Sequence, residues 1–111
     1  MKVNFKIQNN IIIVDLNGEL DHHMAQLVKQ QLNAFLLKKQ AKKILFDFKN
    51  VTFMDSSGIG MILGRYKELQ KINGKVGVVN VTSNIKRIFE MSGLFNIIEF
   101  FTDKSEAIEK L

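Results

Sequence analysis

The run 44–48 is apolar at nearly every position. Such a run predicts a short strand that is covered on both faces, because a strand with one wet face would alternate apolar and polar residues. On either side of this run, apolar residues recur at helical spacing over 22–39 and 57–72. We therefore expect an α/β fold in which a small mixed β-sheet is packed with about four α-helices.

The other elements follow from local signals. Two β-type runs joined at Asn9-Asn10 predict a hairpin over 3–16, and a further turn is expected at 49–50. Asp21, Ser83 and Asp103 are placed to cap helices. The expected order is β-β-α-β-α-β-α-β-α, with helices at 22–39, 57–72, 83–91 and 103–111 and the last two strands at 75–81 and 97–101.

Length and composition limit the kind of protein. The chain has 111 residues, 46% of them hydrophobic, which is enough for one domain over 1–111 with its own core. It has no Cys, so disulfides, thiol nucleophiles and Cys-based metal sites are excluded. It has no apolar run long enough to span a membrane and no signal-peptide pattern. We expect a cytoplasmic protein without membrane contact.

The net charge of +5 raises the question of nucleic-acid binding. Of the 16 basic residues, only Arg65 and Arg87 are arginines, and the densest group of lysines falls at a predicted helix end and the loop after it, over 38–43. Lysines at the C-terminal end of a helix interact favourably with the helix dipole, and lysines in a surface loop increase solubility. Nucleic-acid sites usually combine Arg with stacking aromatic residues, so no nucleic-acid partner is expected.

The segment 53–64 is unusual because Gly58, Gly60 and Gly64 lie within a helical pattern. Each glycine in a helix interior costs about 0.5–1 kcal/mol relative to alanine, so another effect must favour it. One interpretation is that Gly60 or Gly64 lets a neighbouring element pack closely. The other is that a first turn with exposed Gly60 and Met61 lets the backbone of another protein approach the adjacent serines.

Ser56 and Ser57 stand where a strand end turns into a helix, the position at which open α/β sheets present ligand sites. Free backbone N–H groups and the positive end of the helix dipole meet there. Either hydroxyl is therefore able to cap the helix, and a phosphate added to one of them is able to accept those N–H groups. The residues alone leave both interpretations open.

Two nucleotide-binding signatures are incomplete. The spacing of Gly58, Gly60 and Gly64 after a strand resembles a loosened dinucleotide fingerprint, but no acidic residue ends the following strand at 79–81. A phosphate-binding Gly-Lys-Ser/Thr sequence does not occur. Neither motif therefore predicts a nucleotide cofactor.

A hydrolase and a metal site are the other chemical alternatives. Ser56 and Ser57 lack the Gly-x-Ser-x-Gly elbow of serine hydrolases, but His22 and His23 lie at another predicted strand-to-helix corner. A small serine hydrolase or nucleotide-hydrolysing protein that uses Ser56 or Ser57 with His22 is thus the alternative function. Asp21 and the two histidines form a poor metal site, since adjacent residues on a helix diverge by about 100°. No metal is expected.

Three segments closely resemble the STAS-domain anti-sigma factor antagonists, in particular the branch that controls sigma F in spore-forming bacteria. They are 18–23, 53–67 and 86–95, and the resemblance covers nearly the full chain. The Asp55-Ser56-Ser57-Gly58 element is specific to this branch. The resemblance implies a STAS fold.

It also implies a partner switch. In such families the unphosphorylated antagonist binds an anti-sigma factor that is also a serine kinase, and so displaces the sigma factor. The kinase phosphorylates the antagonist with ATP and frees itself, and a serine phosphatase resets the system. By this resemblance Ser56 is the phosphoacceptor. The chain is then not an enzyme, needs no cofactor and is a monomer when free.

The expected contact surface combines the corner after residue 20 with the start of the second long helix. Its residues are Asp21, His22, Asp55, Ser57, Gly58, Ile59, Gly60, Met61 and Gly64. A phosphate on Ser56 would add about −1.5 to −2 charges beside Asp55, in a surface that loses water on docking. We therefore expect phosphorylation to weaken binding by local charge and bulk, without a change of fold.

Overall fold

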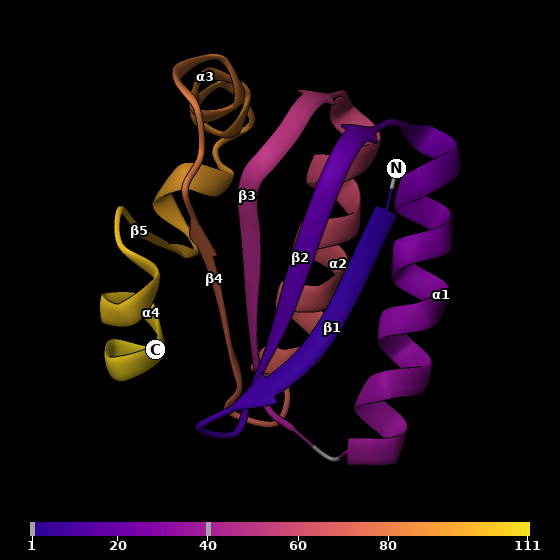
Figure 1. Cartoon of the computed structure of the whole chain (residues 1–111), viewed down its shortest axis with the longest axis vertical. Helices are drawn as coiled ribbons and strands as arrows, with labels where there is room; N and C mark the ends of the chain where they lie inside the picture. Colours follow the sequence, from indigo (N-terminus) through magenta and orange to yellow (C-terminus); the bar gives the residue numbers. More distant parts are fainter. Residues whose placement is uncertain (1, 40) are drawn as a thin grey trace.

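The computed structural model describes residues 2–39 and 41–111, and its centre is a mixed five-stranded sheet (Figure 1). The sheet order is β1-β2-β3-β4-β5. β1 and β2 are antiparallel, and β2 to β5 run parallel. The strands are β1 (Lys2–Gln8), β2 (Ile11–Leu20), β3 (Lys43–Met54), β4 (Lys75–Val79) and β5 (Glu99–Phe101). The predicted small mixed sheet is confirmed.

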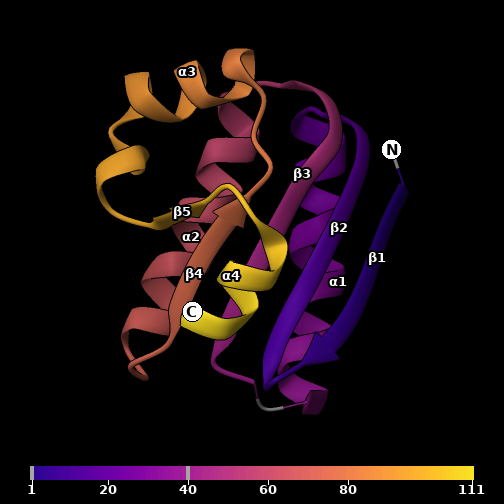
Figure 2. The same cartoon turned by 60° about the vertical axis from the view of Figure 1, so that its left-hand side comes forward.

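Four α-helices and one 3-10 turn connect and cover the strands (Figure 2). They are α1 (His22–Lys39), α2 (Ser56–Gln70), α3 (Ser83–Ser92), the 3-10 turn η1 (Leu94–Asn96) and α4 (Lys104–Lys110). The order matches the prediction, with η1 added. In the part of the chain that the structure describes, no helix has the length and apolar character needed to cross a membrane.

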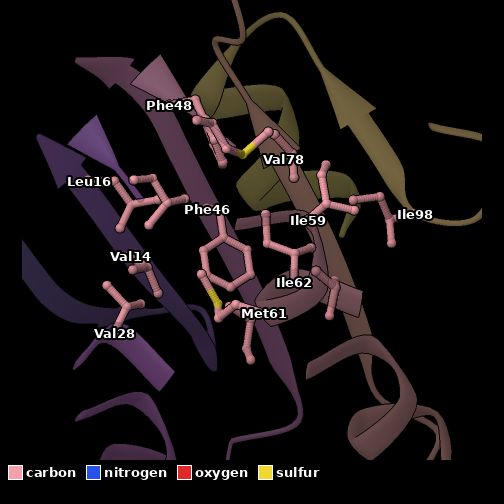
Figure 3. Packing of buried hydrophobic residues seen from close by; sticks show 14 of the residues in the cluster. Val14, Leu16, Val28, Phe46, Phe48, Ile59, Met61, Ile62, Val78 and Ile98 are labelled. Carbon is pink, nitrogen blue, oxygen red and sulfur yellow. The ribbon is translucent and has the colours of Figure 1, made fainter. Parts of the chain in front are cut away.

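The three central strands, β2, β3 and β4, bury both faces because their residues alternate between two hydrophobic clusters. Phe46 and Phe48 of β3 point into the larger cluster, which lies under α1, α2 and α3 (Figure 3). Leu45, which precedes Phe46, points to the other face and packs with Ala107 and Leu111 under α4. All three β3 side chains are fully buried. Burying a side chain of this size stabilises the folded chain by about 1.5–3 kcal/mol. The prediction of a strand covered on both sides at 44–48 is therefore confirmed.

The turn predicted at 49–50 is wrong, because β3 continues through it to Met54. β2 and β3 stay paired through two shifts of register, between Asp15 and Asn17 and between Gly18 and Glu19. The Asp47 carboxylate accepts the N–H of Lys49 at 3.0 Å. With this turn-like hydrogen bond, the polar residues 49–50 form a bulge within β3, and the strand does not end there.

The helix starts predicted from local sequence signals agree with the structure to within one residue. Asp103 caps α4 as predicted, since its Oδ2 accepts the Glu106 N–H at 3.3 Å. Ser83 was expected to cap the third helix, but Thr82 does so, with its hydroxyl accepting the Ile85 N–H at 3.4 Å. The last strand is shorter than the predicted 97–101 because η1 ends only at Asn96.

An ion cluster fixes α4 to the sheet. Asp15 and Asp47 are register partners on β2 and β3, and the Lys104 ammonium lies 3.3 Å from an oxygen of each. Asp47 also accepts from Asn80 at 3.1 Å and from the Lys49 backbone. Burial alone would raise the pKa of Asp47, but these hydrogen bonds and the Lys104 charge outweigh it, so the pKa is lowered. Lys104 therefore relieves the repulsion between two neighbouring carboxylates.

The cluster predicts a loss of stability in acid. The pKa of Asp47 is lower in the folded chain than its ordinary value of 3.8, so its stabilisation is present above about pH 4 and is lost as the pH falls through the folded pKa. We expect Asp47→Asn to lower the free energy of unfolding at pH 7 and to flatten its fall below about pH 4. Urea unfolding at a series of pH values measures both. Glu109→Gln, at an exposed carboxylate on α4, is the control, and an acid profile of Asp47→Asn as steep as that of the control contradicts the prediction.

Candidate functional site

Two helices begin side by side because two parallel strands end side by side. Leu20 and Met54 are register partners at the ends of β2 and β3, and the Asp55 N–H donates to the Leu20 carbonyl at 3.4 Å. Each strand is followed by one aspartate, Asp21 or Asp55, and then by a helix. Both helix N-termini therefore open at the same edge of the sheet, at the top of Figure 1.

The two aspartates cap the two helices. Asp21 Oδ1 accepts the Met24 N–H at 3.0 Å, which confirms the predicted cap of α1. Asp55 Oδ1 accepts the Ser57 N–H at 2.9 Å, so the expectation that a serine hydroxyl caps the next helix is wrong. Asp55 has the extended backbone of a cap residue, with φ −107° and ψ −173°, whereas Ser56 is already the first residue of α2.

The two serines have different surroundings. Ser56 is exposed, whereas Ser57 is half-buried and its Oγ lies 3.3 Å from His22 Nδ1 of α1. The Ser57 and Gly58 N–H groups already bond to the carboxylate and the carbonyl of Asp55. A phosphate on Ser56 would therefore find these two N–H groups already hydrogen-bonded. It would also lie beside the negative Asp55 carboxylate.

The glycines of α2 divide into two kinds. A Cβ on Gly58 would lie 2.6 Å from Met54 Cγ and 3.0 Å from Leu20 Cδ2. A Cβ on Gly60 or on Gly64 would meet nothing within 4 Å. The hypothesis of close packing at Gly60 or Gly64 is therefore wrong, and close packing applies to Gly58, because this residue turns toward the strand ends.

Some of the predicted contact residues do not present a side chain to solvent. Met61 was expected to be exposed, but it is 6% exposed and lies among the core side chains (Figure 3). Ile59 is 9% exposed, and Gly58 is buried. These three positions lie on the inner side of α2. By contrast, Gly60 is exposed at its outer side.

The other predicted contact residues gather at the surface. Asp21 and Asp55 are half-buried at the edge of the sheet, and His22 is exposed. His22 and Ser57 form one end of a depression of about 250 Å³ between α1 and α2, and Gly60 and Gly64 continue it along α2. The structure thus brings together the residues of the two strand-to-helix corners.

Arg65 also lines this depression, although no motif in the sequence singled it out. It follows Ser57 by eight residues and therefore lies on the same face of α2. A search for residues that share the helical face of Ser57, Gly60 and Gly64 would have found it. Its burial, at 6% exposure, depends on the neighbouring helix and is not visible in the sequence.

The site offers a serine and a histidine in contact, but not an oriented triad. His22 Nδ1 approaches Ser57, while the Oδ1 atoms of Asp21 and Asp55 accept backbone N–H groups of the helix starts. Within residues 2–39 and 41–111 there is no group of three or more His, Cys, Asp or Glu side chains arranged to hold a metal ion. The site thus combines the exposed Ser56 with the contact between Ser57 and His22.

Comparison with known proteins gives the family. The STAS domain family matches residues 2–107. The chain belongs to the STAS-domain family. The anti-sigma F factor antagonist of Paenibacillus polymyxa is 36% identical over all of this STAS chain and 95% of its own length. The chain is thus a member of the anti-sigma factor antagonist family that the three sequence segments predicted.

Solved structures agree with the STAS assignment. A crystal structure of a Thermotoga maritima protein has a TM-score of 0.91 to this fold at 26% identity, covering 97% of this chain and 92% of that chain. The Bacillus cell fate determinant SpoIIAA, in its phosphorylated form, has a TM-score of 0.77 at 28% identity, covering 98% of both chains. The predicted STAS fold is therefore confirmed.

The different surroundings of the glycines predict opposite effects of alanine. Gly58→Ala is expected to lower the free energy of unfolding by about 1–3 kcal/mol, because its Cβ overlaps the buried Met54 side chain. Gly64→Ala is expected to raise it by about 0.5–1 kcal/mol, because alanine is the better helix former and its Cβ meets open space. Chemical unfolding of the two variants measures the difference, and equal effects would contradict the packing described here.

Proposed function

We propose that this STAS protein binds an anti-sigma factor that is also a serine kinase, and that its binding releases a sigma factor. The observation that carries the proposal is the exposed Ser56 hydroxyl, the first residue of α2, beside the Asp55 cap. A relative that aligns over the full chain is named an anti-sigma F factor antagonist, which supports sigma F as the factor released. The known phosphorylated form of SpoIIAA supports control by phosphorylation.

Ser56 is the proposed phosphoacceptor. Its Oγ attacks the γ-phosphorus of the ATP bound to the kinase, the hydroxyl proton is lost, and ADP leaves. Ser57 is less suited, because it is half-buried and its Oγ contacts His22 at 3.3 Å. A serine phosphatase then hydrolyses the phosphoserine and restores the binding form.

The phosphate acts on docking through charge. It adds about −1.5 to −2 charges next to the Asp55 carboxylate, whose Oδ1 is already engaged by the Ser57 N–H. A mispaired charge that must be desolvated in an interface costs about 2–5 kcal/mol, which corresponds to a loss of affinity of about 30-fold to several thousand-fold. Local repulsion is therefore sufficient for a switch.

The fold is expected to survive the modification. Asp55, and not a serine, caps α2, so phosphorylation removes no cap. The exposed position of Ser56 leaves the core contacts of Gly58 and Ile59 unchanged. Switching is thus proposed to be a change at the surface and not a conformational transition.

The proposed contact surface is the exposed part of the two helix starts. Asp21, His22 and Asp55 lie at the edge of the sheet, and Gly60 and Gly64 offer a helix face where a Cβ would meet open space. The absence of side chains there lets a partner backbone approach α2. The chain acts as a binding module in the cytoplasm, a monomer when free, and catalyses no reaction of its own.

A second candidate, a serine hydrolase, is favoured by one observation. His22 Nδ1 lies 3.3 Å from Ser57 Oγ, within reach of a base and its nucleophile. The hydroxyl, however, belongs to the first turn of α2 and not to a nucleophile elbow. Hydrolysis of a generic ester that is lost in both Ser57→Ala and His22→Ala would favour this candidate over the binding module.

The phosphoacceptor can be mapped directly. Incubation of the chain with a purified anti-sigma F serine kinase and ATP is expected to add one phosphate, and mass spectrometry of peptides is expected to place it on Ser56. Ser56→Ala should abolish the incorporation, and Ser57→Ala, the matched control, should retain it. Incorporation on Ser57 alone, or none, would overturn the assignment.

The charge mechanism predicts a difference between two substitutions of one residue. Ser56→Asp is expected to weaken binding to the same kinase by at least tenfold, because it places a second carboxylate beside Asp55. Ser56→Ala should bind as the wild type does, because it removes only an exposed hydroxyl. Titration calorimetry measures both affinities. Equal affinities of the two variants would refute control by charge.

A further inference from the structure

A groove follows the seam between α1 and α2. At the end near Ser57 it is lined on α2 by residues spaced three and four apart, Gly60, Gly64 and Arg65 among them. A second depression of about 800 Å³ continues toward the far ends of the helices, and both depressions are lined by Lys29 and Arg65. These two cations therefore stand in the middle of one continuous groove, which we name the α1–α2 groove.

Arg65 is buried without a carboxylate to pair with it. Its residue is 6% exposed, and among the described residues no carboxylate oxygen lies within 4 Å of its nitrogens. Its Nη1 donates to Asn33 Oδ1 at 2.7 Å, and its Nε has no acceptor in the described part of the chain. Buried arginines are normally paired, because an unpaired buried charge is costly.

The surroundings of Arg65 fit an incoming anion. Burial lowers the pKa of its guanidinium, and the negative charge of Glu68 only partly opposes this. The depression that contains Ser57 is lined by Lys29 and His22 but by no acidic residue. A guanidinium has five N–H donors in a planar fork that matches the two oxygens of a carboxylate.

The far end of the groove is mostly apolar, although Asn33, Lys42 and Glu68 also line it. Leu37 is 84% exposed, Ile72 is 47% exposed, and both line the depression beyond Arg65. A small inorganic anion would leave these side chains uncovered, whereas a protein segment that carries an acidic and an apolar side chain would cover both parts. Charge and shape together favour a polypeptide.

We propose that the α1–α2 groove is a docking site for a segment of the partner protein, which places an acidic side chain against Arg65 and Lys29 and an apolar side chain against Leu37 and Ile72. The proposal rests on the proposed function for the identity of the partner, the anti-sigma factor. The groove begins at Ser57, so the docking site is continuous with the surface around Ser56. Because Gly60 and Gly64 have no side chains, the segment has space to lie along this part of the groove.

A titration with small peptides tests the groove without the partner. Nitrogen-15 labelled full-length protein is mixed with the blocked dipeptide Glu-Leu or, as the matched control, Gln-Leu. We expect Glu-Leu alone to shift the Arg65 Nε–H signal and the backbone signals of Gly60 and Gly64. No shift, or equal shifts with both peptides, would overturn a carboxylate site. Equal shifts produced by inorganic phosphate at lower concentration would show a phosphate site instead.

A matched pair of variants tests the role in docking. Arg65→Met is expected to weaken binding to a purified anti-sigma F serine kinase at least tenfold, whereas Lys67→Met, at an exposed lysine of the same helix, is expected to leave it unchanged. The melting temperature of free Arg65→Met should equal or exceed that of the wild type, since a buried unpaired charge is removed.

The two measurements separate a docking residue from a structural one. A lower melting temperature with unchanged affinity would show that Arg65 only supports the fold, and would overturn the proposal. If the wild type forms no complex with the kinase, the proposed function fails, and the peptide titration still decides whether the groove takes a carboxylate.

Discussion

The parallel pairing of β2 with β3 as far as Leu20 and Met54 is the constraint on which the rest of the site depends. Parallel neighbours end at the same edge of a sheet, so the helices that follow them start together. The two register shifts keep the strands paired although β3 carries extra residues. Without that pairing, His22 and Ser57, which are 35 residues apart in sequence, would not meet.

Capping by aspartate then determines what the serines are free to do. Because Asp55 satisfies the Ser57 N–H, the Ser56 hydroxyl is not needed by the helix and stays exposed at its first turn. The same carboxylate provides the negative charge that a phosphate would have to tolerate. One residue thus both builds the helix start and sets the electrostatic effect of modifying its neighbour.

Several residues of the α1–α2 groove do not serve the stability of the free chain. Gly60 and Gly64 lie in a helix where alanine would be favoured and where a Cβ would meet open space. Arg65 is buried without a charge partner in the described structure. Natural proteins break local rules of this kind mainly at functional sites, and here the exceptions share one face of α2.

The sequence by itself determined the α/β class, the order of the elements, the Asp21 and Asp103 caps and the segment around Ser56, because helical spacing, capping and turn signals act over a few residues. Only the tertiary structure decided that β3 runs through 49–50, that Gly58 rather than Gly64 packs closely, and that Met61 and Arg65 are buried. Each of these outcomes depends on contacts with elements distant in the sequence. Local patterns do not say which face of α2 packs on the strand ends and which face lies against α1. The pairing of β2 with β3 decides this, because it places the starts of α1 and α2 side by side.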